Sequence, residues 1–85
     1  MKKIYLITTK GCEACSIMKN ILIDVFNKGS IEILDIADVP NWIKINVKLT
    51  DFPTTILVKD NVIKYHFSGT KSVKKIKDIV ADVSF

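Results

Sequence analysis

The hydrophobic positions in the first half of the chain predict a strand, a long helix and a second strand. Residues 3–8 are rich in branched and aromatic side chains, which is typical of a buried strand. We expect residues 31–36 to form the second strand, and Gly29 to follow the end of the helix as its C′ residue. The helix between them is indicated by apolar residues at i, i+3, i+4 spacing, namely Ala14, Ile17, Met18, Ile21, Leu22, Val25 and Phe26.

The middle of the chain, residues 38–52, has a less regular pattern. Pro40 and Asn41 suit the start of a short helix. However, Ile43, Ile45 and Val47 alternate as they would in a strand, so the pattern alone leaves both interpretations open. If the segment is helical, its anchors are expected to be Trp42, Ile43 and Val47.

The end of the chain predicts a hairpin and a helix. Residues 54–59 and 62–67 are both typical of strands, and Asp60 and Asn61 between them form a two-residue turn signal. The two strands are therefore expected to pair antiparallel. A final amphipathic helix follows, with capping candidates Thr70 and Ser72 and an apolar stripe of Val73, Ile76, Ile79, Val80 and Val83.

The order of these elements, β-α-β-(α)-β-β-α, predicts an α/β protein with a four-stranded mixed sheet. A right-handed β-α-β unit makes the first two strands parallel, while the hairpin makes the last two antiparallel. Two helices can then cover one face of the sheet, with the short middle helix on the other. At 85 residues we expect one domain spanning positions 1–85.

Composition and charge narrow the range of partners. The net charge of +4 comes from lysine alone, since the chain has no arginine, the usual residue for bidentate contacts to phosphate and guanine. No apolar run approaches the roughly 18 residues of a membrane helix. We therefore expect neither a nucleic-acid nor a membrane partner, and an acidic protein partner suits the charge better. A solvated helix face accounts for the cluster of Lys71, Lys74, Lys75 and Lys77.

The candidate chemistry lies in Cys12-Glu13-Ala14-Cys15, which holds both cysteines of the chain. The pair falls where the first strand gives way to the long helix, and unpaired N–H groups at a helix N-terminus favour thiolate over thiol. A second thiol one turn away can resolve the mixed disulfide that a thiolate forms. Lys10 is expected to favour the thiolate at Cys12, and the adjacent Glu13 to oppose it.

Together with the strand order, three features resemble the thioredoxin superfamily over nearly the whole chain: the C-x-x-C pair, Phe52-Pro53 before the third strand, and Gly69 before the last helix. The smallest members, including glutaredoxin-like proteins, are the most similar. The resemblance implies a thioredoxin-like fold, with Cys12 as the exposed nucleophile and Cys15 as the buried resolving thiol. It further implies that Pro53 is a cis-proline facing the pair. The expected substrate-binding residues are Gly11, Phe52, Pro53 and Gly69.

The chain also departs from the superfamily's usual motifs. Gly11 stands where thioredoxins usually carry tryptophan, and Glu13-Ala14 replaces their Gly-Pro. The buried acid of thioredoxins would fall at Leu6, so that proton relay is missing. Residues 68–71, Ser-Gly-Thr-Lys, lack the glycine pair and the acid with which glutaredoxins hold glutathione.

The expected function is reduction of protein disulfides by a cytoplasmic, monomeric thiol–disulfide oxidoreductase. Its redox group is the Cys12–Cys15 disulfide, with no other cofactor and no metal, and its electron donor is thioredoxin reductase or another dithiol reductant. A glutathione-dependent glutaredoxin is the first alternative, with glutathione expected to bind weakly. A Cu(I) chaperone is another, because two thiolates suit Cu(I), but such domains usually carry methionine at the position of Lys10 and run β-α-β-β-α-β. A non-catalytic thioredoxin-like binding module is the third.

Overall fold

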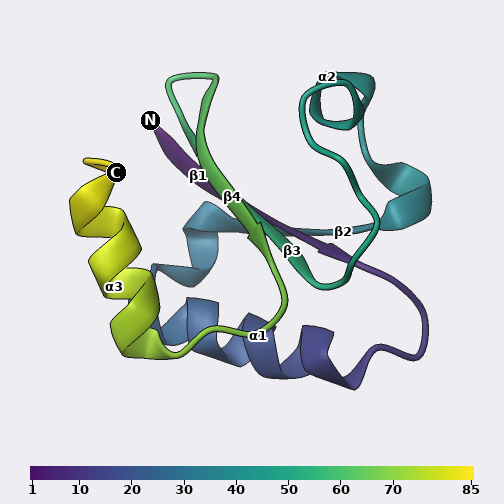
Figure 1. Cartoon of the computed structure of the whole chain (residues 1–85), viewed down its shortest axis with the longest axis horizontal. Helices are drawn as coiled ribbons and strands as arrows, with labels where there is room; N and C mark the ends of the chain where they lie inside the picture. Colours follow the sequence, from purple (N-terminus) through teal and green to yellow (C-terminus); the bar gives the residue numbers. More distant parts are fainter.

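The computed structural model describes residues 1–85 and contains four strands and three helices (Figure 1). Two short 3₁₀ turns, Lys28–Ser30 and Ile36–Asp38, flank the second strand. No helix is both long enough and apolar enough to cross a membrane. In chain order the elements are β1 (Lys2–Thr8), α1 (Glu13–Val25), β2 (Ile31–Asp35), α2 (Asn41–Lys44), β3 (Thr54–Lys59), β4 (Val62–Ser68) and α3 (Val73–Asp82).

The four strands form one mixed sheet in the order β2-β1-β3-β4. Strand β1 pairs parallel to β2 and antiparallel to β3, and β3 pairs antiparallel to β4. Because β1 is central, Leu6 lies opposite both Ile33 of β2 and Thr55 of β3. The predicted α/β fold class and its β-α-β-α-β-β-α order are confirmed.

The sheet separates two hydrophobic cores, with α1 and α3 on one face and α2 on the other (Figure 1). Alternation along β1 divides its side chains between them, since Ile4 and Leu6 face α1 and α3, while Ile7 faces α2. The larger core is completed by Met18, Leu22, Leu57, Phe67, Ile76, Ile79 and Phe85, and the smaller one by Val39, Ile43, Val47, Ile56 and Val58.

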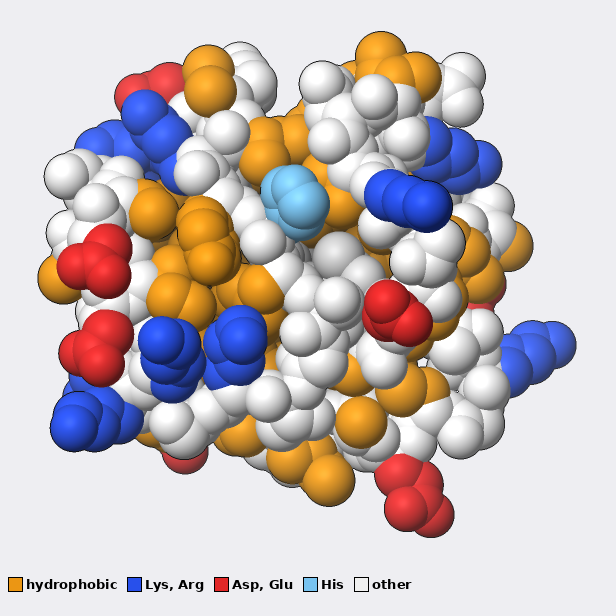
Figure 2. All heavy atoms as spheres, viewed as in Figure 1, with side chains coloured by type: hydrophobic (Ala, Val, Ile, Leu, Met, Phe, Trp, Pro, Cys, Tyr) orange, Lys and Arg blue, Asp and Glu red, His pale blue; other side chains and the backbone are white.

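The middle segment, residues 38–52, contains the short helix α2 and no strand. Pro40 precedes α2, Ile43 and Val47 are buried, and Ile45 is 81% exposed, so the alternating interpretation is wrong. Trp42 stays partly exposed and meets the Tyr5 ring edge-on at a centroid distance of 5.7 Å. Figure 2 shows a hollow between the β3–β4 hairpin and this helix, with hydrophobic side chains at its floor.

Helix α1 departs from the sequence pattern at one apolar position, Ile17, and the expectation for Gly29 is wrong. Ile17 is 54% exposed, because it lies about 100° around the helix from the buried Met18 and so outside the face that packs on the sheet. Gly29 does not follow the helix end, since Phe26 already leaves helical geometry and the Asn27 side chain caps a separate 3₁₀ turn containing Gly29.

A side-chain hydrogen bond also sets the end of β2. The Asp35 carboxylate accepts a hydrogen bond from the N–H of Ala37, which turns the chain at Ile36. Strand β2 therefore ends at Asp35, one residue earlier than predicted.

A side-chain hydrogen bond of the same type decides which residue caps α3. Ser72, and not Thr70, accepts from the Lys75 N–H.

The hairpin turn uses two residues with positive φ, Asp60 at 52° and Asn61 at 66°. This geometry fits the twist of a two-residue hairpin, and asparagine tolerates it better than alanine does. We expect Asn61→Ala to lower the free energy of unfolding by about 1 kcal/mol, and Asn61→Gly to leave it unchanged or raise it. Urea denaturation of the oxidised protein measures both.

The matched control is Asn20→Ala, because Asn20 is exposed within α1, where alanine is favourable. That variant should be as stable as the parent or more so. Equal stability of Asn61→Ala and Asn61→Gly would contradict the role given to the turn.

Candidate active site

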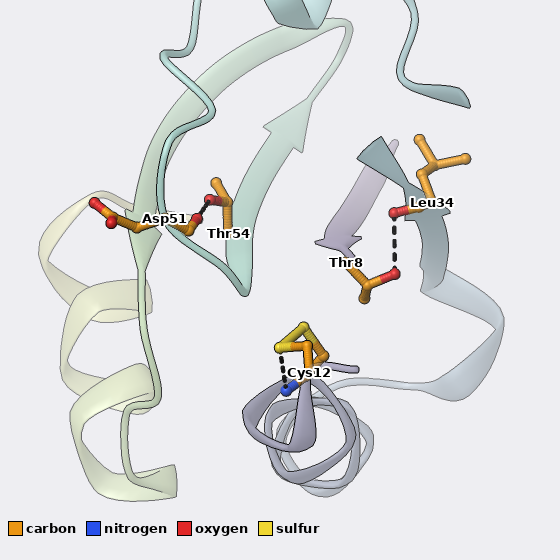
Figure 3. Close-up of a disulfide and its surroundings, with 6 residues drawn as sticks. Thr8, Cys12, Leu34, Asp51 and Thr54 are labelled. Carbon is orange, nitrogen blue, oxygen red and sulfur yellow. Dashed lines mark hydrogen bonds between the residues drawn. A yellow bond between two sulfur atoms is a disulfide. The ribbon is translucent and has the colours of Figure 1, made fainter. Parts of the chain in front are cut away.

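A disulfide joins Cys12 and Cys15 at the start of α1, with a Cα–Cα distance of 5.3 Å. Cys12 is the N-cap residue, and its Sγ accepts a hydrogen bond of 3.1 Å from the N–H of Cys15 (Figure 3). Cys15 is buried at 6% exposure, whereas Cys12 is partly exposed. One sulfur is therefore accessible at a helix N-terminus, and the other is enclosed.

The loop between β1 and α1 turns at Gly11, which has φ of +72°. Glycine adopts this geometry without the steric cost that a Cβ atom would add. Lys10 and Glu13 flank the turn and are both exposed. Thr8, at the end of β1, donates a long hydrogen bond of 3.4 Å to the carbonyl oxygen of Leu34 on β2 (Figure 3).

The loop before β3 approaches the disulfide from the other side (Figure 3). Pro53 is buried, and its peptide bond with Phe52 is cis. The Thr54 hydroxyl donates a 2.6 Å hydrogen bond to the carbonyl oxygen of Asp51, which closes the loop around the proline. Phe52 packs against the smaller core, on the α2 face of the sheet.

Gly69 connects the segment before α3 to the same loop. Its N–H donates a 2.8 Å hydrogen bond to the carbonyl oxygen of Pro53. Its φ of +82° lies in the region that side chains disfavour, although a Cβ atom there would meet nothing within 4 Å. The structure thus joins Pro53 and Gly69 directly.

A pocket of about 260 Å³ opens beside the disulfide on the β2 side. Sequence reasoning missed this pocket, because its walls come from both β1 and β2 and from the outer side of α1. The half-exposed Ile33 is the one signal that could have pointed to it, as an apolar residue left uncovered at a sheet edge. The lining residues are Leu6, Thr8, Thr9, Gly11, Cys12, Cys15, Ser16, Lys19 and Ile33.

The charged groups near the disulfide are all at the surface. The buried polar residues of the protein are Thr54 and Thr55, so no carboxylate lies beneath the pair, and Leu6 there is fully buried. The two shifted pKa values belong to the far end of the sheet. A hydrogen bond with Glu32 raises the pKa of Lys3, and the N-terminal amino group lowers the pKa of Asp60.

No protein-family model matches the sequence, and no curated protein matches it. Solved structures do. Chloroplastic thioredoxin z superposes with a TM-score of 0.72 at 17% identity, covering 99% of this chain and 79% of that one. Thioredoxin 1 from Thermosipho africanus gives a TM-score of 0.72 at 18% identity, covering 94% and 91% of the two chains. The protein has the thioredoxin fold.

Thioredoxin-2 of the malaria parasite shares this fold as well, with a TM-score of 0.69 at 16% identity over 96% of this chain and 82% of that one. At such identities the likeness establishes the fold and leaves the activity to the site itself. The C-x-x-C spacing of the disulfide at the start of α1, on a thioredoxin fold, supports thiol–disulfide exchange in general.

The conformation of Gly69 gives a test of the site's construction. We expect Gly69→Ala to lower the free energy of unfolding by about 1–2 kcal/mol, because alanine disfavours positive φ. Relief of that strain would move the N–H away from Pro53 and weaken any activity that depends on the loop. Urea denaturation and a disulfide reduction assay measure the two effects.

Gly29→Ala is the control, because a Cβ atom at Gly29 would lie in ordinary contact, 3.6 Å from Asn27 Oδ1. We expect it to change stability by less than about 0.5 kcal/mol. If both alanine variants behave alike, the strain assigned to Gly69 is wrong.

Proposed function

We propose that this protein is a thiol–disulfide oxidoreductase that reduces protein disulfides through Cys12 and Cys15. The observation that carries the proposal is the asymmetry of the pair. Cys12 is accessible at the N-terminus of α1, while Cys15 is buried one turn inside the helix. Attack on a substrate needs an accessible thiolate, and resolution needs a second thiol held close to the first.

Reduction proceeds in two balanced exchanges. The Cys12 thiolate attacks a substrate disulfide, forms a mixed disulfide with one sulfur and releases the other as a thiolate. The Cys15 thiolate then attacks Cys12 Sγ, which forms the Cys12–Cys15 disulfide and releases the second substrate thiolate. The substrate gains two electrons and two protons, and the protein loses them. The Cys15 N–H, which points at Cys12 Sγ, stabilises the negative sulfur before attack.

The loop at Pro53 is proposed to receive the polypeptide around the substrate disulfide. It approaches the pair from the β3 side, and Gly69 is hydrogen-bonded to it. Gly11 leaves the space before Cys12 without a side chain, and Phe52 anchors the loop in the core. These features favour an extended protein segment as the substrate.

A dithiol reductant, such as a thioredoxin reductase, is the proposed electron donor. Glutathione is disfavoured because the segment at Thr70 and Lys71 offers no acid for its amino group. Lys71 points instead toward the Phe67 ring, with Nζ 5.4 Å from the ring centroid. Asp51 is exposed beside the proline loop and would repel glutathione carboxylates.

The Cu(I) chaperone is disfavoured by the observed topology. Such domains run β-α-β-β-α-β, whereas here α2 stands between β2 and the β3–β4 hairpin. The strand order β2-β1-β3-β4 is instead that of the thioredoxin fold. Thiol–disulfide exchange is therefore the one function proposed. We further propose that the protein acts as a monomer in the cytoplasm.

Serine variants of the two cysteines separate their roles. We expect Cys12→Ser to abolish reduction of a protein disulfide such as insulin, because the accessible nucleophile is lost. We expect Cys15→Ser to retain attack and to accumulate a covalent mixed disulfide at Cys12, since nothing resolves it. Non-reducing electrophoresis and mass spectrometry measure the adduct.

The double variant, Cys12→Ser with Cys15→Ser, is the control and should form no adduct. Alkylation of the reduced parent should be faster at Cys12 than at Cys15. Faster alkylation of Cys15 would reverse the assignment.

The electron donor can be tested on one purified sample. With insulin as substrate, NADPH consumption should be at least tenfold faster with thioredoxin reductase than with glutathione and glutathione reductase, a difference of about 1.4 kcal/mol in activation free energy. Asp51→Asn should raise the rate with glutathione, because it removes the repulsion of carboxylates. Rapid glutathione-dependent turnover by the parent would show that the protein is a glutaredoxin.

A further inference from the structure

Thr55 carries the one buried side-chain oxygen in the protein that has no hydrogen-bond partner. The residue is 0% exposed, on β3 two positions after Pro53. Its neighbour Thr54 is also buried, but the Thr54 hydroxyl donates to the carbonyl oxygen of Asp51. An unpartnered buried hydroxyl costs free energy, so the contrast between the two threonines requires an explanation.

The strand register places Thr55 on the face of the sheet that carries α1. It lies opposite Leu6 of β1 and Phe67 of β4, and it shares its face with Leu57, two residues along β3. All three neighbours belong to the larger hydrophobic core. None of their side chains offers a group that a hydroxyl could bind.

On this face of the sheet α1 buries Cys15, Met18 and Leu22, and α3 buries the apolar Ile76 and Ile79. Leu6, opposite Thr55, lines one pocket together with both cysteines, which puts the pair over this part of the sheet. Cys15 is the one buried group on this side of α1 whose polarity changes with redox state. As a disulfide sulfur it is a poor acceptor, and as a thiolate it is a strong one.

We propose that Thr55 is a positioning residue for the resolving cysteine, and that its hydroxyl donates a hydrogen bond to the Cys15 thiolate in the reduced protein. The inference rests on the proposed function. In the resolving exchange the Cys15 proton passes to water, the thiolate attacks Cys12 Sγ, and the departing substrate thiolate takes up a proton from water. The hydrogen bond to Thr55 ends when the Cys12–Cys15 disulfide forms.

This arrangement biases the redox equilibrium. The hydroxyl is unpartnered in the oxidised protein, which this structure represents, and partnered in the reduced protein. Thr55 therefore destabilises the disulfide form relative to the dithiol form, and it lowers the pKa of Cys15. The charged groups next to the pair in sequence or in its pocket are Lys10, Glu13 and Lys19, and all three are exposed. On the neighbouring segments, Asp51 before β3 is exposed and Lys71 before α3 is half-buried.

The test replaces Thr55 by valine, which keeps the shape and removes the hydroxyl, and by serine, which keeps the hydroxyl. In glutathione redox buffers at equilibrium, Thr55→Val should favour the disulfide about tenfold more than the parent does, a potential about 30 mV more negative. Thr55→Ser should stay near the parent. Thr55→Val should also raise the urea midpoint of the oxidised protein without raising that of the reduced protein.

A second measurement isolates Cys15. In the Cys12→Ser background, the pH profile of Cys15 alkylation should shift to higher pH with Thr55→Val and should be restored with Thr55→Ser. Thr54→Val is the matched control, because it removes a hydroxyl that is already bonded to backbone. It should lower the urea midpoints of both redox forms equally and leave the potential unchanged.

An unchanged potential and an unchanged Cys15 profile in Thr55→Val would overturn the proposal, even if insulin reduction by the parent is normal. Equal stabilisation of both redox forms would do the same, because it would show that the hydroxyl has no partner in either state. The potential is measured without a protein substrate. Loss of the proposed function would therefore appear in the insulin assay and not in this result.

Discussion

The hydrogen bond from the Cys15 N–H to Cys12 Sγ caps helix α1 and also lies within the proposed redox site. The first turn of any helix has N–H groups without intrahelical partners, and a side chain at the N-cap position usually satisfies one of them. Here a sulfur takes that position. In the proposed exchange, the bond that begins α1 would also stabilise a negative charge on Cys12 Sγ, so a change at the helix start would also change the redox pair.

Backbone hydrogen bonds between strands also bring segments that are distant in sequence together at one end of the sheet. Strand β1 ends at Thr8 beside β2, and the loop that follows it leads to the cysteine pair. Strand β3 starts at Thr54 on the other side of the pair. The Pro53 carbonyl then receives the Gly69 N–H, which fixes the approach to α3. Three loops far apart in sequence meet because the strands between them are paired in register.

The sequence predicted these features to the extent that they depend on local pattern. Strand β3 was expected at its observed bounds, and the cysteine pair was identified from residue type and spacing. Ser72 was one of two capping candidates, and the role of Pro53 came from the resemblance to the thioredoxin superfamily. The exposure of Ile17 could not be predicted, because helical periodicity allows two adjacent apolar stripes and only packing selects one. Gly29 and Ile36 were misplaced because the side chains of Asn27 and Asp35 form short-range bonds that outweigh the longer pattern.

Thr55 lay beyond such reasoning for a different reason. In the sequence it is one more β-branched residue in a buried strand. Threonine is common in strands, so the residue type gives no sign of a special role. Its significance appears only when the register sets it opposite Leu6 and the burial of Cys15 is known. The surface near the disulfide contains exposed charges, Lys10 and Glu13, whose fields are weakened by solvent. The interior beneath it contains no charge, so a hydroxyl there lies in a medium of low dielectric, where the hydrogen bond proposed for Thr55 would have its largest effect on the redox pair.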